Sequence, residues 1–303
     1  MDSCLNNSHT RTVRSRPFLY ADLLLRMVMA LFELTKPRIA FASVVTVIAA
    51  YVSAGGTRSV VELFILFCAS GMAAGGSLAF NQWWERDTDP LMKRTCARPL
   101  PRSCIPAWVA LAWSIFLSIA GVLWLLLAFN GLTAAIGVAT ILVYAGIYTP
   151  MKRKSRWATE VGSISGALPP LLGAAAAGNI GSVSAWVLAI ALFFWQMPHF
   201  FSIGWIHRKD YRAAGLPLLP AVDRTGRLTA NWSFVYTIFL CLTLMIPWSL
   251  GMIGGLFGTA AVLGSIWMLV LAWKFKNTEG TRETAARKLF RTSLIVMPII
   301  LFV

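Results

Sequence analysis

Charged side chains are scarce in this sequence: they make up 13% of its 303 residues, about half of the share that is usual in a soluble domain. Asp, Glu, Lys and Arg are absent from five long runs, which cover residues 39–57, 63–84, 103–148, 161–206 and 228–273. A membrane-spanning helix needs about 20 consecutive apolar residues, so each of the three longest runs accommodates two helices and a turn. The pattern predicts an all-α polytopic membrane protein. It excludes a soluble enzyme, a secreted disulfide scaffold and a nucleic-acid-binding protein.

The sequence also lacks the cysteine spacings that bind metals or form redox pairs. Neither a CxxC pair nor a Cys–His spacing occurs, which indicates ordinary thiols in a reducing compartment. The first 30 residues are rich in Arg but have no apolar core of a secretory signal. We therefore expect residues 1–33 to form a basic cytoplasmic N-terminal tail, with a transit peptide as the alternative. Residues 34–303 are expected to form a single transmembrane domain.

Glycine and asparagine mark the turns inside the long apolar runs, because both residues accept the backbone angles of tight turns. Turns are predicted at residues 130–131, 178–182 and 247–255. With one span in each shorter run, these turns define eight helices. A ninth helix is expected to begin near Leu289 and to be short or truncated. The predicted fold is therefore a bundle of about nine transmembrane helices.

The net charge of +15 is concentrated on one side of the predicted membrane. Every Lys and Arg except Arg58 lies in the N-terminal segment or in alternate loops. Positive residues stay on the cytoplasmic side during membrane insertion, so we expect the N-terminus and these loops to be cytoplasmic. The expected location is the inner membrane of a bacterium, with the mitochondrial inner membrane as the alternative.

Closely spaced polar side chains follow the second charge-free run. Asn81, Glu85 and Asp89 lie four residues apart, so a continuing helix places them on one face until Pro90 ends it. Such oxygen donors suit Mg²⁺ when phosphate oxygens complete its coordination. The cations at positions 93, 94 and 98 suit a diphosphate. The alternative is a solvated polar cap whose charges balance one another.

A second polar cluster spans residues 197–220 and contains His199 and Asp210. The alternation of loops places it on the same membrane side as the first cluster. Proline-rich segments at 98–101 and 217–220 suggest a tandem repeat, with the two clusters facing each other across a central cavity. Ionisable groups at membrane depth are usually functional. His199 could bind haem iron, hydrogen-bond a substrate, or bond to a carbonyl freed by Pro198.

Several motifs together resemble the UbiA superfamily of intramembrane prenyltransferases, and within it the branch that acts on haem. The first family motif, Asn-x3-Asp-x3-Asp, falls on Asn81, Glu85 and Asp89, and Asp87 matches an extra acid of the haem branch. Further matches lie at residues 35–38, 94–95, 98–101, 148–155, 162–170, 195–200, 209–211 and 217–220. Two features depart from the general pattern: Glu85 replaces Asp, and Ala214 stands where a second aspartate would follow Asp210.

The resemblance implies a role for each of these residues. Catalytic roles fall on Asn81, Glu85, Asp87, Asp89 and Asp210, of which all but Asp87 are expected to hold a divalent cation, Mg²⁺. Diphosphate binding falls on Lys36, Arg94, Arg98, Lys152 and Arg153. His199 is expected to bind haem. The active site is expected at the cytoplasmic side of a central cavity.

The resemblance also implies the reaction and the partners. The expected activity is transfer of the farnesyl group of farnesyl diphosphate to a vinyl group of haem b, with addition of water, giving haem O and diphosphate. Haem b is thus a substrate, and the partners are farnesyl diphosphate, haem b, the lipid bilayer and a downstream haem A synthase. The alternatives are a prenyltransferase for an aromatic or quinone precursor, a transporter, and a non-catalytic haem chaperone. Ala214 argues against the quinone type, and the retained carboxylates argue against a chaperone. The position of every acid near a loop argues against a transporter.

Overall fold

The structure is a computed structural model that describes residues 16–251, 255–278 and 280–301. Every regular element within these ranges is helical, which confirms the all-α prediction. The α-helices are α1 (Arg16–Leu34), α2 (Pro37–Ser53), α3 (Val60–Trp84), α4 (Ala107–Ala128), α5 (Gly131–Ile141), α6 (Thr149–Met151), α7 (Ala158–Ala176), α8 (Val183–Ile206), α9 (Arg208–Ala213), α10 (Leu219–Val222), α11 (Arg227–Ser249), α12 (Gly255–Asn277) and α13 (Arg282–Ile300). A 3₁₀ turn, η1, covers Asp89–Leu91, and a π-helical segment, η2, covers Leu142–Tyr148.

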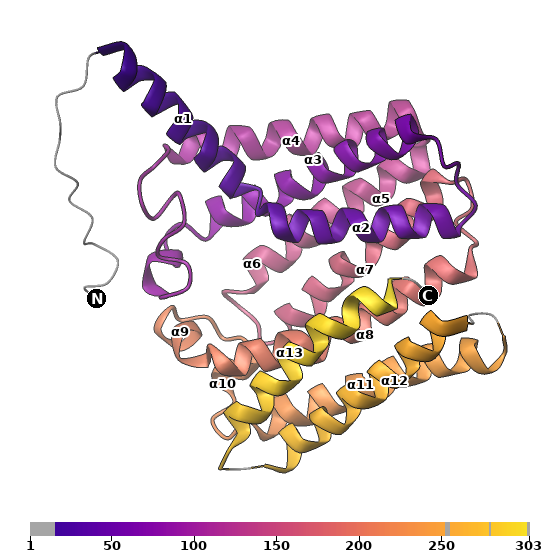
Figure 1. Cartoon of the computed structure of the whole chain (residues 1–303). Helices are drawn as coiled ribbons and strands as arrows, with labels where there is room; N and C mark the ends of the chain where they lie inside the picture. Colours follow the sequence, from indigo (N-terminus) through magenta and orange to yellow (C-terminus); the bar gives the residue numbers. More distant parts are fainter. Residues whose placement is uncertain (1–15, 252–254, 279, 302–303) are drawn as a thin grey trace.

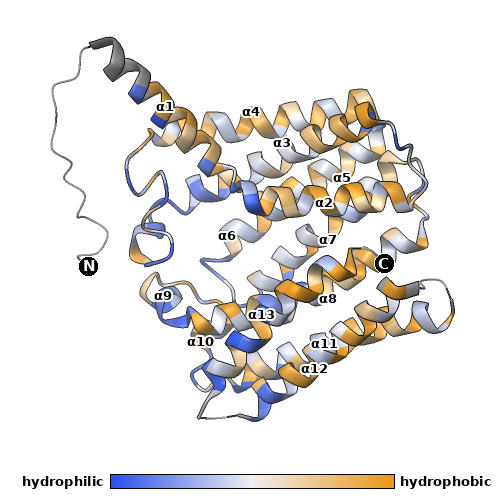
Figure 2. Cartoon of the chain, in the orientation of Figure 1, coloured by the Kyte–Doolittle hydropathy of each residue, from blue (hydrophilic) through white to orange (hydrophobic). Residues whose placement is uncertain are grey.

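Six of the described helices are long and apolar enough to cross a membrane. They are α3, α4, the continuous rod Gly131–Met151, α8, α11 and the Gly258–Asn277 part of α12, while α2 is a shorter apolar helix. Hydrophobic residues occupy most of the length of these helices, and hydrophilic residues are concentrated in the loops (Figure 2). The chain is therefore a multi-pass membrane protein. The expected number of nine spanning helices remains a prediction.

The predicted turns agree with the observed helix ends. Asn130 caps α5 by accepting a hydrogen bond from the backbone N–H of Thr133, and Ser182 caps α8. The third turn includes residues 252–254, which lie outside the described residues. The expected ninth helix is α13, which begins earlier than predicted, at Arg282. Its first turns are charged but helical, and an Arg287–Glu283 pair at 2.9 Å supports them.

The expected N-terminal tail divides into two parts. Residues 1–15 lie outside the described residues, whereas residues 16–34 form α1. Ala30 and Leu34 are buried in a cluster with residues of α3 and α4. The other face of α1 exposes large apolar side chains such as Val28 and Phe32. The boundary at residue 33 and the cytoplasmic location of this segment remain predictions.

Small residues let the helices approach closely. A Cβ atom added to Gly121 of α4 would lie 2.5 Å from the backbone nitrogen of Ala73 in α3. A Cβ on Gly173 of α7 would lie 2.1 Å from the carbonyl oxygen of Val47 in α2. Backbone contact of this kind is typical of membrane helices, whose association depends on van der Waals packing. These two contacts fix α3 against α4 and α2 against α7.

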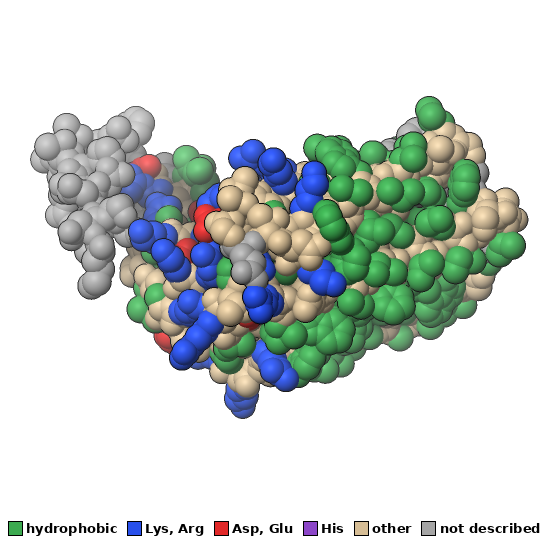
Figure 3. Space-filling view, turned by 90° about the horizontal axis from the view of Figure 1, so that it is seen from below, with side chains coloured by type: hydrophobic (Ala, Val, Ile, Leu, Met, Phe, Trp, Pro, Cys, Tyr) green, Lys and Arg blue, Asp and Glu red, His purple; other side chains and the backbone are tan. Residues whose placement is uncertain are grey.

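The helices form one continuous bundle (Figure 1). Helix α7 packs against α2, α5 and α8, and α8 packs in turn against α11 and α13. Lys and Arg side chains gather toward one end of the molecule, which we call the basic end (Figure 3). The loops after α3, α6 and α8 meet there through the cluster Met92, Ala158, Ala214, Leu216 and Leu218. The two polar clusters singled out in the sequence therefore lie at the same end of the bundle.

Candidate active site

Three polar residues, one near the end of α3 and two in the segment that follows it, share one buried face, as predicted. The sequence predicts that this helix continues as far as Pro90. Helix α3 instead ends at Trp84, one residue before Glu85. Hydrogen bonds from the N–H of Glu85 to the carbonyl of Asn81, and from the N–H of Asp89 to that of Glu85, nevertheless keep a helix-like spacing. All three side chains are buried. Buried polar groups require partners.

The partners are cationic side chains from three segments. One nitrogen of Arg98 lies 2.8 Å from each carboxylate oxygen of Asp89. Lys152 Nζ donates to Glu85 Oε1 at 2.7 Å, and Lys36 Nζ donates to Asn81 Oδ1 at 2.7 Å. These six residues form what we call the buried charge network. Charge-assisted hydrogen bonds of this length are the strongest type in proteins.

Electrostatics keep the network ionised at Glu85. Burial raises the pKa of Glu85, but the charges of Lys152 and Lys36 outweigh burial and lower it to about 2. Burial acts to lower the pKa of Lys152, but the charge of Glu85 outweighs burial and raises this pKa above its ordinary value. Burial and the Arg98 charge instead lower the pKa of Lys36 well below its ordinary value. A bound anion would therefore favour the charged form of Lys36 and raise its pKa.

The backbone at the start of α2 aims Lys36 into the network. Lys36 has φ of 46°, a left-handed conformation that is uncommon outside glycine and clusters at functional sites. Gln82 Nε2 holds this junction by donating to the carbonyl oxygens of Glu33 and Leu34. The sequence reasoning missed Gln82, although its position next to Asn81 is a usable signal.

The π-helical segment η2 helps to position the residues that contact the network from α6. Thr149 Oγ1 donates to the carbonyl of Tyr144 at 2.8 Å, across the widened turn, and Asn81 Nδ2 donates to Thr149 Oγ1 at 3.3 Å. Lys152 Nζ lies 4.6 Å from the centre of the Tyr148 ring. Single π turns occur frequently at functional sites. The sequence shows no signal for this turn.

Other expected site residues lie outside the network. Asp87 is 65% exposed, and its nearest charged partner is Arg86 at 3.8 Å. Arg153 donates to the carbonyl of Trp84 at 2.8 Å. Arg94 donates instead to the hydroxyl of Tyr211 at 3.2 Å, and so joins the loop after α3 to α9.

Asp210 lies in the first turn of α9 and pairs with His207 at 3.6 Å. Burial and the nearby Arg94 lower the pKa of His207, although Asp210 opposes this shift. No group of three or more His, Cys, Asp or Glu residues able to hold a metal occurs in the described ranges. The network still suits Mg²⁺, which usually takes one or two carboxylates and completes its shell with water and substrate phosphates. Glu85 and Asp89, with the amide oxygen of Asn81, supply such a donor set.

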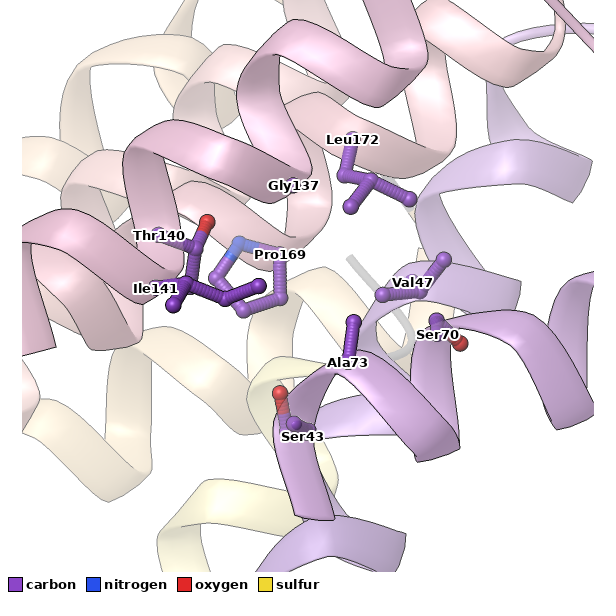
Figure 4. A pocket seen from close by; sticks show the side chains of 10 residues that line it. Ser43, Val47, Ser70, Ala73, Gly137, Thr140, Ile141, Pro169 and Leu172 are labelled. Carbon is purple, nitrogen blue, oxygen red and sulfur yellow. The ribbon is translucent and has the colours of Figure 1, made fainter. Parts of the chain in front are cut away.

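A small cavity lies between the helices of the bundle (Figure 4). Its volume is about 30 Å³. Ser43, Val47, Ser70, Ala73, Ala74, Gly137, Thr140, Ile141, Pro169 and Leu172 line it, from α2, α3, α5 and α7. Ser43 follows Lys36, and Ala74 precedes Asn81, by about two helical turns, or roughly 10 Å. The cavity and the network therefore lie along the same two helices, about two turns apart.

Comparison with known proteins identifies the family. Residues 42–295 match the UbiA prenyltransferase family. The chain belongs to that family. It is 40% identical over 269 residues to a protein of Opitutus terrae named "Protoheme IX farnesyltransferase", and this match covers 89% of the chain and 91% of that protein. A protein of the same name from Solibacter usitatus is 39% identical, with 88% of the chain and 94% of that protein covered.

Solved UbiA structures share the fold. The apo structure of a UbiA homolog from Aeropyrum pernix has a TM-score of 0.68 at 17% identity, covering 87% of this chain and 96% of that one. A UbiA homolog from Archaeoglobus fulgidus, bound to GPP and Mg²⁺, has a TM-score of 0.60 at 12% identity, covering 90% and 99%. Membership of the UbiA family thus accounts for the helical bundle and identifies the chain as a prenyltransferase.

Proposed function

We propose that this UbiA prenyltransferase transfers the farnesyl group of farnesyl diphosphate to a vinyl group of haem b, giving haem O and diphosphate. The observation that carries the proposal is the match, over about nine tenths of both chains, to proteins named protoheme IX farnesyltransferase. In the reaction, the C–O bond to the diphosphate breaks, and a C–C bond forms between farnesyl and the vinyl carbon. Water then adds to the resulting cation and loses a proton.

The cations of the buried charge network bind the diphosphate. Lys36, Arg98 and Lys152 converge from three segments, so they can surround a polyanion that takes their present partners' place. Arg94 lies in the same loop as Arg98, and Arg153 directly follows Lys152, so both add to the positive field. Stabilising charge that develops on a leaving group is usually the largest contribution to catalysis.

Asn81, Glu85 and Asp89 would hold Mg²⁺ on their shared face, with Asp87 and Asp210 supplied by adjacent segments. Bound Mg²⁺ supplies positive charge to the departing diphosphate. The low pKa of Glu85 means that its carboxylate stays ionised at any physiological pH. Glu85 is therefore ready to accept a cation without first losing a proton.

The apolar part of the bundle receives the farnesyl chain. The cavity of Figure 4 begins about two helical turns from Lys36 and Asn81. This position suits a farnesyl chain whose diphosphate is bound in the network. Because the vinyl group itself attacks the allylic cation, no nucleophilic side chain is needed. The walls of the cavity exclude water until the C–C bond has formed.

His199 in α8 is the candidate for holding haem b. It packs against Trp195 at a ring distance of 5.0 Å, at the seam between α8 and α13. The concentration of Lys and Arg at the basic end favours a cytoplasmic orientation of that end in a bacterial inner membrane (Figure 3). A downstream haem A synthase as consumer of the product remains a prediction.

A product assay tests the proposal. Purified protein in liposomes receives haem b, farnesyl diphosphate and Mg²⁺, and the haems are separated by chromatography and identified by mass spectrometry. We expect a farnesylated, hydrated haem that disappears with EDTA. Intact haem b in folded protein would contradict the proposal. Product from a quinone or aromatic precursor instead would identify a different prenyl acceptor for the same fold.

A further inference from the structure

The imidazole of His199 packs against two aromatic rings and is hydrogen-bonded at one nitrogen. Trp195 stacks on it at 5.0 Å with an interplanar angle of 23°, and Phe290 of α13 lies 4.9 Å away. On the edge, His199 Nδ1 lies 2.8 Å from the hydroxyl oxygen of Ser293, also in α13. Trp195 Nε1 donates to the carbonyl of Ser293 at 2.9 Å, so the two helices are joined at this point twice.

The hydrogen bonds of Ser293 determine which imidazole nitrogen carries the proton. A hydroxyl group has one hydrogen to donate and two lone pairs that accept. Ser293 Oγ donates its hydrogen to the carbonyl of Phe290 at 2.7 Å, which leaves a lone pair to face His199. The contact with His199 is then a hydrogen bond donated by Nδ1–H. In the neutral imidazole, Nε2 consequently has no proton and presents a lone pair.

The other ring nitrogen, Nε2, does not face Ser293, because the two ring nitrogens of an imidazole point in different directions. Leu188, Leu192 and Trp195 lie on the same helical face as His199 and are buried in the large core cluster that also includes Ala50 of α2. Within residues 16–251, 255–278 and 280–301, no hydrogen bond to Nε2 occurs. The imidazole is thus held by Ser293 at one nitrogen, and its other nitrogen, Nε2, makes no hydrogen bond with the described residues.

We propose that Ser293 is a positioning residue that fixes His199 in the Nδ1–H tautomer, so that Nε2 binds the iron of haem b. The inference rests on the proposed function, because it takes haem as the prenyl acceptor. Metal-binding histidines generally donate their other N–H to an acceptor, which sets the tautomer and the ring orientation. Here that acceptor comes from a different helix. Iron bound at Nε2 would fix the macrocycle, and with it the vinyl group.

Two serine variants and a matched control test the proposal. Ser293→Ala removes the acceptor of the Nδ1 proton, whereas Ser293→Thr retains a hydroxyl. The control is Ser265→Ala in α12: Ser265 is equally buried and donates to the carbonyl three residues earlier, as Ser293 does. It lies outside the described contacts of His199. Its loss therefore reports the cost of removing a buried hydroxyl that does not contact His199.

The first measurement is the tautomer in the absence of haem. In protein labelled with ¹⁵N-histidine, the wild type is expected to show His199 as Nδ1–H, assigned by comparison with His199→Gln. Ser293→Ala is expected to give a mixture of tautomers, while Ser265→Ala and Ser293→Thr remain like wild type. A wild-type His199 protonated at Nε2 would overturn the proposal, whatever the protein does with haem.

The second measurement is a titration with haem b, followed by the Soret band and by electron paramagnetic resonance of the ferric form. Loss of an outer partner of a metal-binding histidine typically costs 10–100-fold in affinity, so Ser293→Ala should bind haem about tenfold more weakly. His199→Gly should lose the axial-ligand spectrum and regain it with added imidazole. Unchanged spectra in His199→Gly would overturn the proposal but leave the proposed function standing. A wild type that binds no haem would overturn both.

Discussion

One nitrogen of the Arg98 guanidinium lies 2.8 Å from both carboxylate oxygens of Asp89, and Asp89 is completely buried. The same nitrogen lies 3.5 Å from Glu85 Oε2. The oxygens suited to Mg²⁺ are therefore held by the cations suited to diphosphate. A metal ion that takes the carboxylates releases the cations, and an anion that takes the cations releases the carboxylates. Binding of either ligand should thus favour binding of the other.

We expect Mg²⁺ and diphosphate to bind with positive coupling of at least about tenfold, within the usual range for linked sites. Isothermal titration of pyrophosphate with and without Mg²⁺ measures it, and by reciprocity the Mg²⁺ affinity must rise by the same factor. Complexation in solution must be subtracted with a protein-free titration. Equal pyrophosphate affinity in both conditions would contradict the exchange.

Arg98→Ala should destabilise the protein strongly, because it leaves Asp89 buried without its cation. Removal of one partner of a buried ion pair typically costs about 3–5 kcal/mol. Mg²⁺ should raise the unfolding temperature of Arg98→Ala more than that of wild type, since the carboxylates are then open to the metal. The matched control is Arg26→Ala, whose exposed pair with Asp22 contributes little. An Arg98→Ala protein as stable as wild type would show that Arg98 does not neutralise Asp89 in solution.

Alanine variants of Asp87 and Asp89 should distinguish an effect on turnover from an effect on stability. Asp87 is 65% exposed with one long ion pair, so Asp87→Ala should unfold at the wild-type temperature. If it acts on the reaction, as the family motif implies, turnover should nevertheless fall about 100-fold, the loss typical of one electrostatic group. Asp89→Ala should lose both turnover and stability. Wild-type turnover in Asp87→Ala would remove this residue from the site.

Variants of Glu85 test whether the site requires the length of its side chain. Glu85→Asp restores the residue usual in the family and keeps the charge, but it withdraws the oxygens by about one C–C bond, roughly 1.5 Å, from Lys152, which now lies at 2.7 Å. We expect Glu85→Asp to retain substantial activity and Glu85→Gln to lose at least about 100-fold. Steady-state rates of haem O formation check both. An inactive Glu85→Asp would show that the longer side chain is required.

Leu172 should limit the length of the prenyl chain. It lines the small cavity, whose volume of about 30 Å³ leaves little room unless side chains move. Leu172→Ala enlarges it and should raise the use of geranylgeranyl diphosphate relative to farnesyl diphosphate, at a stability cost of about 2–5 kcal/mol. Ala74→Leu should shift preference toward geranyl diphosphate.

The control for the cavity is Ile164→Ala, an exposed residue of the same helix α7. It should leave the ratio of chain lengths unchanged, because its side chain does not line the cavity. Competition between two diphosphates in one reaction, read by mass spectrometry, measures the ratio directly. The same ratio in Leu172→Ala and wild type would place the end of the prenyl chain elsewhere.

The sequence by itself determined the class of fold and the spacing of the polar residues at the end of α3. Membrane insertion depends on local hydropathy, so charge-free runs were sufficient to indicate the helices, and the spacing of Asn81, Glu85 and Asp89 was sufficient to place them on one face. The turn residues Asn130 and Ser182 likewise act through local hydrogen bonds. These features depend on neighbours within a few residues along the chain.

Only the tertiary structure decided which cation meets which oxygen. Lys152 and Glu85 lie far apart in sequence, and their contact depends on how α3 and α6 pack and on a π turn that no local pattern indicates. The same holds for Ser293, which reaches His199 because α13 packs against α8. Asp87 is an acidic residue of the same sequence motif, but its side chain is exposed to solvent because the chain turns after Trp84. Pairings of this kind arise from packing between distant segments, and a sequence pattern records them only indirectly.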